Sequence, residues 1–259
     1  MNIAVITGAS SGIGKEMTET LHNYFNDIDE VWVIARSEEK LKQLKSKFKI
    51  KVVAMDLLET QNLEVLKEMF QKNNVNIKIL INSAGYGKFG SFKNIDTGSS
   101  LGMIDLNCRA LVGVTEISIP FMQKGARILQ VCSVASFLPI PLINVYAAST
   151  AFVQSYSLAL KQELKSLGIS VTTLCPNWTN TSFFKVAENV DSSKKAVKNY
   201  MFMLSPQKVA KVGLLALKKR KTFSIPGISG KLLFVATKLV PKRLAMKAWL
   251  INCNKELLK

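Results

Sequence analysis

The sequence predicts an α/β fold built on a doubly wound parallel sheet, and three observations support this. Short apolar runs alternate with amphipathic stretches from the first residues to about residue 174. The runs are apolar almost throughout, as expected of strands that are covered on both faces. A glycine-rich turn joins the first run directly to the first amphipathic stretch. Because alternating strands and helices require right-handed crossovers, we expect one parallel sheet with helices on both faces.

The elements can be placed in order by their periodicity. Strands are expected at residues 3–7, 31–35, 52–55, 77–81, 127–131 and 170–174, with a last short strand and turn at 223–227. Helices are expected at residues 15–25, 38–48, 62–73, 99–121 and 145–167, and a further helix begins at Ser205-Pro206, a serine N-cap followed by proline.

Composition narrows the class of protein. Of 259 residues, 48% are hydrophobic and 20% are charged, which is typical of a globular chain. The four cysteines lie far apart without a CxxC pair, and His22 is the single histidine, so we expect buried thiols and no metal site. Strand-like sequence follows Met1 within one residue, which leaves no space for a signal peptide, so we expect a cytoplasmic protein.

The net charge of +17 is unevenly distributed, since residues 206–259 hold 13 Lys and Arg against the single acidic residue Glu256. Such a segment could meet anionic lipid, nucleic acid or an acidic partner, or be solvated. No nucleic-acid reading motif accompanies the charge, so we do not expect nucleic-acid binding.

The glycine turn is a candidate phosphate site. Gly8 can take a positive φ, Gly12 lets the backbone approach a pyrophosphate, and Gly14 lets helix and strand pack closely. N–H groups at the helix start would face the anion, although a simple tight turn would leave the same pattern. The candidate residues of this turn are Gly8, Ser10, Ser11, Gly12, Ile13 and Gly14.

Residues that follow the next strands should lie at the same edge of the sheet. Arg36-Ser37 stands where an acidic residue would bind the ribose hydroxyls of NAD, and an arginine there favours the 2′-phosphate of NADP. Arg36 could instead be an ordinary solvated charge. Asp56-Leu57 could contact an adenine ring, or Asp56 could cap the following helix.

Several motifs together resemble the short-chain dehydrogenase/reductase family over residues 1–185. The matching residues, in the family's order and spacing, are Thr7–Gly14, Asn82–Gly85, Asn107, Ser133, Tyr146–Ser149 and Pro176–Thr181. The resemblance is strongest to the branch called hydroxysteroid-dehydrogenase-like. It implies a Rossmann-type NAD(P)-binding domain over residues 1–230, a basic amphipathic C-terminal extension over residues 231–259, and a homo-oligomer, either a dimer or a tetramer.

The resemblance also implies hydride transfer between the nicotinamide of NADP and a carbonyl or alcohol. Tyr146 would exchange a proton with the substrate oxygen, Ser133 would hydrogen-bond that oxygen, and Asn107 would hold its helix open for an ordered water. A core serine and an ordinary helix tyrosine are the structural alternatives. The remaining residues that the resemblance assigns to the cofactor are Asn82, Ala84, Gly85, Pro176, Thr179 and Thr181.

Residue 150 departs from the family's pattern, because Thr150 stands where the family has the lysine of its YxxxK motif. That lysine binds the nicotinamide ribose and lowers the tyrosine pKa, and a threonine is too short and uncharged to replace it. Lys161 lies about three helical turns away. The chain could be a substituted reductase, an NADP(H)-binding pseudoenzyme that acts as a sensor or membrane-associated binding protein, or a variant in which another group activates Tyr146. We expect an oxidoreductase that is impaired at neutral pH.

Two further segments bear on the substrate and on the binding partner: the residues after Thr181 and the C-terminal extension. Phe183 and Phe184 suggest a bulky apolar substrate, but they could equally pack on the sheet. In the extension, the apolar run 232–236 is too short to span a bilayer, and Pro241 should divide the stretch into two helices. This extension could rest on an anionic membrane, or pack on its own domain or on a partner subunit.

Overall fold

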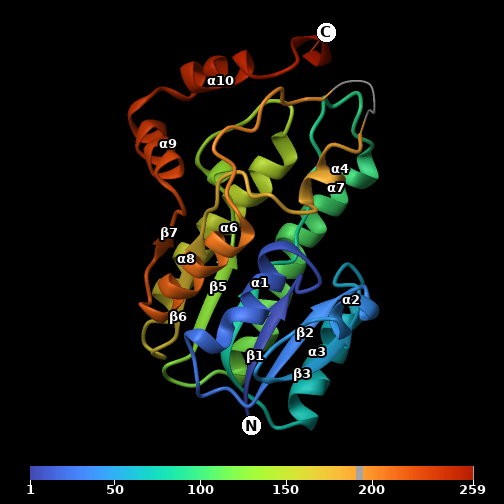
Figure 1. The fold of residues 1–259 in the computed structure, drawn as a ribbon, viewed down its shortest axis with the longest axis vertical. Helices are drawn as coiled ribbons and strands as arrows, with labels where there is room; N and C mark the ends of the chain where they lie inside the picture. The colour runs from blue at the N-terminus through green and yellow to red at the C-terminus, as the bar shows by residue number, and fades with distance from the viewer. Residues whose placement is uncertain (191–194, 259) are drawn as a thin grey trace.

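A computed structural model describes residues 1–190 and 195–258. Its centre is a parallel sheet in the order β3-β2-β1-β4-β5-β6-β7, which confirms the predicted doubly wound fold (Figure 1). The order reverses between β1 and β4, so a crevice opens there at the carboxyl ends of the strands. The strands are β1 (Asn2–Thr7), β2 (Glu30–Ala35), β3 (Lys49–Ala54), β4 (Asn76–Asn82), β5 (Arg127–Val131), β6 (Ser170–Leu174) and β7 (Phe223–Ser224).

Helices cover both faces of the sheet, because alternate residues of each strand point to opposite sides. Ile3 and Val5 of β1 face the core shared with α3, α5 and α6, whereas Ala4 and Ile6 face the core shared with α1, α2 and α8. The helices are α1 (Gly12–Thr20), α2 (Glu38–Lys42), α3 (Gln61–Lys72), α4 (Thr97–Ile104), α5 (Leu111–Ser118), α6 (Asn144–Glu163), α7 (Phe183–Ala187), α8 (Pro206–Lys218), α9 (Ile228–Leu239) and α10 (Lys242–Ile251).

Several predicted helices differ in extent from the expectation. The helix expected over 15–25 is Gly12–Thr20, and the one expected over 145–167 ends at Glu163. The helix expected over 99–121 is divided, since a π-helical segment, Asp105–Ala110, separates α4 from α5. The helix expected over 38–48 ends at Lys42. The Ser46 hydroxyl accepts a hydrogen bond from the Phe48 N–H (3.1 Å), which satisfies that group locally outside a helix.

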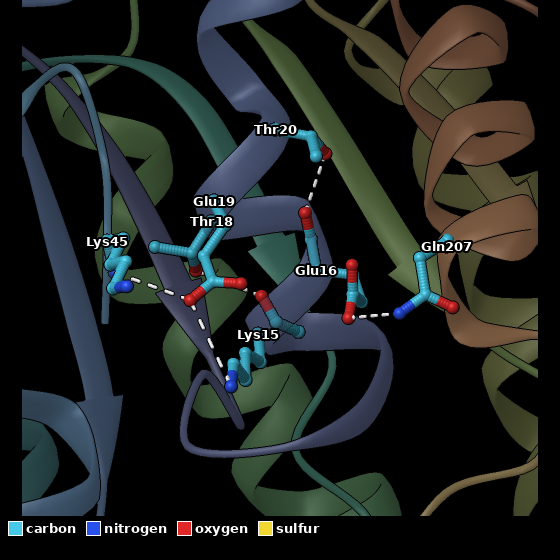
Figure 2. Close-up of polar contacts among 8 residues, drawn as sticks. Lys15, Glu16, Thr18, Glu19, Thr20, Lys45 and Gln207 are labelled. Carbon is cyan, nitrogen blue, oxygen red and sulfur yellow. Dashed lines mark hydrogen bonds and ion pairs between the residues drawn. The ribbon is translucent and has the colours of Figure 1, made fainter. Parts of the chain in front are cut away.

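Polar contacts hold α1, the helix that follows the glycine turn, in place (Figure 2). The Gln207 amide of α8 donates to the Glu16 carboxylate over 2.6 Å, and the Glu19 carboxylate accepts from the Lys45 backbone N–H at 3.3 Å. Lys15 lies 4.0 Å from the same Glu19 carboxylate. These contacts connect α1 to α8 on one side and to the α2–β3 connection on the other, which fixes the N-terminus of α1 at the crevice.

The C-terminal helices lie at the far end of the molecule from the N-terminus (Figure 1). Pro241 separates α9 from α10, as predicted from the sequence. Within residues 1–190 and 195–258, no helix is long and apolar enough to cross a membrane.

Candidate functional site

A cavity of about 1030 Å³ runs along the carboxyl edge of the sheet, from the glycine turn to the C-terminal helices. It is lined by residues that follow six of the seven strands, so segments far apart in sequence meet there. Gly14 and Asn82 are the two predicted site residues outside its wall. The predicted residues that line it are Gly8, Ser10, Ser11, Gly12, Ile13, Arg36, Ser37, Asp56, Leu57, Ala84, Gly85, Asn107, Ser133, Tyr146, Thr150, Pro176, Thr179 and Thr181.

The glycine turn has the compact geometry predicted for it. Gly8 adopts a φ of +67° and Gly12 a φ of +54°, a region that side chains disfavour. A Cβ on Gly14 would lie 2.5 Å from the carbonyl oxygen of Gly8, so a side chain there would push α1 away from β1. A Cβ on Gly12 would lie 3.1 Å from the Thr181 side chain. The turn after β1 and the loop after β6 therefore meet at this end of the cavity.

Two cations lie at the end of the cavity beyond β2. Arg36 follows the strand, and the Ser37 hydroxyl caps α2 by accepting a hydrogen bond from the Lys40 N–H (3.4 Å). This cap begins α2 at Glu38, and Lys40 then lines the cavity together with Arg36. Lys40 was not predicted from the sequence, although its place in the first turn of a serine-capped helix after Arg36 pointed to it.

Asp56 lies in the turn after β3 and does not cap the following helix. Its carboxylate accepts from the Leu58 N–H at 3.0 Å, and its carbonyl accepts from the Asn62 amide at 2.8 Å. The N-cap of α3 is Thr60, so the capping alternative for Asp56 is wrong. Asp56 is instead held in a turn that presents Leu57 to the cavity.

Hydrogen bonds connect the residues after β4 to the last residue of β1. The Thr7 hydroxyl accepts from the N–H groups of Ser83 (3.1 Å) and Ala84 (3.2 Å). Asn82 is buried and donates to the Thr115 hydroxyl at 2.9 Å, which places its amide behind the cavity wall. Asn82 thus contributes to the position of this edge and does not reach the cavity.

Asn107 connects three segments at the base of the cavity. It lies in the π-helical segment, and its amide oxygen accepts from the Tyr86 N–H at 3.0 Å. Its amide nitrogen donates to the Tyr86 carbonyl (2.9 Å) and to the Ser149 hydroxyl (3.0 Å). The Ser149 hydroxyl in turn donates to the Tyr146 carbonyl at 2.8 Å. Asn107 therefore links the loop after β4 to the first turn of α6, where Tyr146 lies.

Tyr146 and Ser133 both line the cavity. The Ser133 hydroxyl accepts from the Ala135 N–H at 3.1 Å, which fixes its side chain after β5. Burial raises the pKa of the Tyr146 phenol to about 12, and a hydrogen bond with the Ser133 hydroxyl opposes that rise. The ring of Phe183 lies 5.4 Å from the Tyr146 ring, which contributes to the desolvation.

Thr150 lies one helical turn beyond Tyr146 and lines the same cavity. Its hydroxyl donates to the Ala147 carbonyl at 2.9 Å, and its own carbonyl accepts a weak hydrogen bond from the Cys132 thiol. Among the described residues, the groups that shift the Tyr146 pKa are Ser133, Cys132 and Cys175, and none of these is a cation.

The loop after β6 closes the cavity from the other side. The Pro176 carbonyl accepts from the Val134 N–H (3.1 Å), and the Thr179 hydroxyl donates to the Asn177 carbonyl (2.8 Å). The Thr181 hydroxyl accepts from the Phe183 N–H at 3.3 Å, so the loop leads directly into α7. The Asn177 amide also donates to the Ser229 hydroxyl at 3.3 Å, which joins this loop to α9.

Beyond Tyr146 the cavity wall is mostly apolar, although Ser182, Lys185 and Thr237 also line it. It includes the C-terminal helices, which were predicted to form a separate extension. The Trp249 indole N–H donates to the Pro141 carbonyl at 2.9 Å, which holds α10 against the body of the protein. This apolar end is lined by Leu138, Ile140, Ile143, Trp178, Phe183, Phe184, Leu233, Ala236, Val240, Ala248 and Trp249. The amphipathic pattern of residues 231–251 left open whether this segment rests on a membrane or packs on its own domain or a partner, and it did not indicate that one face would line the cavity.

All four cysteines are buried and unpaired, as predicted. Within residues 1–190 and 195–258, no cluster of three or more His, Cys, Asp or Glu could hold a metal ion.

The chain is similar to known proteins over most of its length. Residues 2–191 match a family model described as short chain dehydrogenase. An uncharacterized oxidoreductase of Staphylococcus aureus strain MRSA252 is 26% identical over 232 residues, covering 88% of this chain and 95% of that protein.

Two solved structures share the fold. A short-chain dehydrogenase from Sphingobium yanoikuyae in complex with NADPH has a TM-score of 0.78 at 23% identity, and the match covers 96% of each chain. A short chain dehydrogenase/reductase from Burkholderia phymatum in complex with NAD has a TM-score of 0.78 at 18% identity, covering 95% of each chain.

Proposed function

Because this chain belongs to the short chain dehydrogenase family, whose members are NAD(P)-dependent oxidoreductases, we propose that it transfers a hydride between NADP and a carbonyl or alcohol. One observation carries the proposal. The Tyr146 phenol and the Ser133 hydroxyl line the same cavity as the Gly8–Gly14 turn, so a dinucleotide held at the turn would place its nicotinamide end near both hydroxyls.

The residues at the turn fit a dinucleotide phosphate. Gly8 and Gly12 adopt positive φ, and the Ser11 side chain makes no capping bond to α1, so the N-terminus of α1 remains available to an anion. Arg36 and Lys40 would bind a 2′-phosphate, which favours NADP over NAD. Leu57, Ala84 and Gly85 would line the adenosine half. The bound cofactor supplies the hydride.

The proton is handled by this chain's own side chains. Hydride delivery to a carbonyl builds negative charge on its oxygen, and the Tyr146 phenol would donate a proton to that oxygen while Ser133 hydrogen-bonds it. Asn107 would set the position of Tyr146 through Ser149. Thr179 and Thr181 would contact the nicotinamide end of the cofactor from the loop after β6.

The presence of the uncharged Thr150 next to Tyr146 supports a reduced rate of hydride transfer at neutral pH. Within residues 1–190 and 195–258 no cation lowers the Tyr146 pKa, so the phenol is a weak acid, and the phenolate needed for alcohol oxidation is rare at pH 7. In this proposal the chain is an active but impaired oxidoreductase that favours the direction in which Tyr146 donates its proton.

Bulky apolar carbonyl compounds fit the substrate end of the cavity best. Its aromatic wall contains Trp178, Phe183, Phe184 and Trp249, and such walls recognise substrates by apolar burial rather than by charge.

The exposed apolar side chains on two helices support self-association. Leu101 and Ile104 of α4 and Phe152 of α6 are all exposed, and the two helices are in contact. We propose that these helices pair between copies of the chain in a dimer or tetramer.

The basic extension supports contact with an anionic membrane. Residues 228–258 hold six Lys and Arg and one acidic residue, Glu256. We propose a cytoplasmic protein that associates with a membrane surface through this segment.

NADPH oxidation in the presence of a panel of ketones and aldehydes tests the proposed function. The wild-type chain should oxidise NADPH with at least one bulky apolar carbonyl, and Tyr146→Phe should bind NADPH but not turn over. Tight NADPH binding without turnover, in the wild type and in Thr150→Lys alike, would instead support a pseudoenzyme.

A further inference from the structure

An exposed apolar stripe runs along the outer face of α9. Ile228, Leu232, Val235 and Leu239 follow the helical spacing of one face, and their side chains are 77%, 65%, 53% and 78% exposed. Amphipathic helices of globular proteins normally turn such a stripe toward a core. Leu244 and Ile251 extend the exposed apolar surface onto α10.

Cations flank this stripe. Lys231 and Lys238 lie seven residues apart on one side of α9, and Lys242, Arg243 and Lys247 continue the positive charge along α10. An apolar stripe bordered by lysine and arginine is the pattern that rests in the headgroup region of an anionic bilayer. The charge therefore favours a membrane over a second copy of this strongly basic chain as the occupant of the face.

The opposite face of α9 belongs to the cavity. Leu233, Ala236 and Thr237 line it, and Phe234 on the same side packs against Phe137 with ring centroids 4.8 Å apart. From α10, Ala245, Ala248 and Trp249 also line the cavity. The two C-terminal helices thus form a thin wall with the cavity on one side and the exposed apolar stripe on the other.

Seven residues of this region line the cavity and are also exposed, and five of them are apolar. The apolar ones are Val186 of α7, Leu233 and Ala236 of α9, Val240 at the end of α9 and Ala248 of α10, and the polar ones are Ser182 and Lys185. The rim of the cavity here is therefore mostly apolar and continuous with the surface that carries the stripe, with the Lys185 cation beside it. The apolar part of the rim offers no hydrogen bonds to a polar substrate arriving from water.

We propose that α9 and α10 seat the protein on an anionic membrane so that the cavity takes up an apolar carbonyl substrate directly from the lipid, through the rim at Val186, Leu233 and Val240. The inference rests on the proposed function for what happens to the substrate in the cavity, namely its reduction. The uptake of the substrate from lipid does not depend on that function. The inference names the substrate class as lipid-dissolved ketones and aldehydes.

The first test is vesicle binding by the full chain. Vesicles of phosphatidylcholine with phosphatidylglycerol should sediment the wild type, and vesicles of phosphatidylcholine alone should sediment much less of it. The double variant Val235→Glu/Leu239→Glu removes two side chains of the stripe without touching the cavity wall, and it should weaken vesicle binding at least about tenfold.

A matched control exists elsewhere on the surface. Val65 of α3 and Leu167 after α6 are 44% and 54% exposed and lie outside the cavity wall, so Val65→Glu/Leu167→Glu introduces the same charges at the same residue types. The control should sediment like the wild type. Equal loss of binding in both double variants would overturn the proposal, because the stripe would then have no special role.

The second test follows uptake without turnover. A fluorescent long-chain ketone dissolved in anionic vesicles should transfer to the wild-type protein and quench its tryptophan emission, since Trp249 and Trp178 line the cavity. Leu233→Phe narrows the rim without adding a tryptophan, and it should slow this transfer several-fold while leaving vesicle binding intact. Transfer at the wild-type rate in both Leu233→Phe and the stripe variant would overturn the proposed route.

The outcomes separate this inference from the proposed function. Vesicle binding and ketone transfer without NADPH oxidation would count against the oxidoreductase but support the route. Reduction of a short, water-soluble ketone with no vesicle binding would support the oxidoreductase and overturn the route. A stripe variant that loses only a self-association seen by sedimentation would assign the face to a second copy of the chain, and this too would overturn the proposal.

Discussion

The Thr150 hydroxyl donates a hydrogen bond to the carbonyl oxygen of Ala147, 2.9 Å away in the preceding turn of α6. The Thr150 side chain is thus turned into its own helix and offers Tyr146 no charge. The remaining groups around the phenol leave its pKa at about 12. Among the described residues, none of the groups that shift the Tyr146 pKa is a cation, which is the basis of our proposal that the phenol ionises poorly near neutral pH.

Restoring a cation should raise the activity. In Thr150→Lys, an ammonium near the Tyr146 phenol should lower its pKa by about 1–3 units, as opposite charges at close range do. We therefore expect alcohol oxidation at pH 7 to rise about tenfold or more. Steady-state kinetics of the purified variant provide the measurement, with Thr150→Val as the matched control at wild-type rate. A Thr150→Lys rate equal to that of Thr150→Val would contradict the expectation.

The pH dependence follows from the raised pKa of Tyr146. Below its pKa of about 12, the phenolate fraction rises tenfold with each pH unit, so kcat/KM for alcohol oxidation should climb steadily from pH 7 to 10. The reverse reduction needs the protonated phenol, which persists through this range, so it should not decline there because of Tyr146. A plateau of the oxidation rate below pH 9 in the wild type would show that another group activates the phenol.

Cofactor preference should depend on the two cations beyond β2. Arg36→Ala and Lys40→Ala should each weaken NADPH binding about tenfold or more, the loss expected for a charge-assisted bond to phosphate, and should leave NADH binding nearly unchanged. Calorimetry with both cofactors measures this. Lys42→Ala is the control, because Lys42 pairs with Glu38 at 2.8 Å and lies outside the cavity wall. Equal losses for NADPH and NADH would argue against a 2′-phosphate site.

The close contact at Gly14 should make that position intolerant of a side chain. A methyl group there would lie 2.5 Å from the Gly8 carbonyl, so Gly14→Ala should lower the free energy of unfolding by about 1–3 kcal/mol and weaken NADPH binding. Urea denaturation and calorimetry report the two effects. In Gly98→Ala the added methyl meets the Asp96 carboxylate at 3.2 Å rather than a backbone, and its stability should change little. Wild-type stability in Gly14→Ala would contradict the packing argument.

The sheet could be predicted from sequence because each strand is an uninterrupted apolar run between turn residues, such as Val31–Ala35 in β2. The residues at which helices begin and end were harder to predict from the sequence, because individual side-chain hydrogen bonds and local backbone geometry determine them. The Ser46 hydroxyl bond accompanies the early end of α2, and the π-helical segment around Asn107 divides the expected long helix. Neither feature changes the hydrophobic period from which the helices were predicted.

The site was predictable where a motif fixes the backbone and less so where tertiary packing brings distant segments together. Gly8 has the expected positive φ, and Gly14 lies in the expected close contact between α1 and β1. Both features depend on local geometry. Lys40 and Trp249 reach the cavity through the placement of α2 and α10, which depends on contacts far away in sequence. Asn82, predicted to serve the cofactor, donates a hydrogen bond to Thr115 and lies outside the cavity lining.

Deuterium transfer tests the central claim most directly. The wild-type chain would be incubated with NADPH deuterated at C4 of the nicotinamide and with an apolar ketone, and the alcohol product analysed by mass spectrometry. We predict that the product carries one deuterium in the wild type, in larger yield in Thr150→Lys, and that no labelled product forms in Tyr146→Phe. Labelled alcohol formed equally well by Tyr146→Phe, or none from any of the three proteins, would contradict the account.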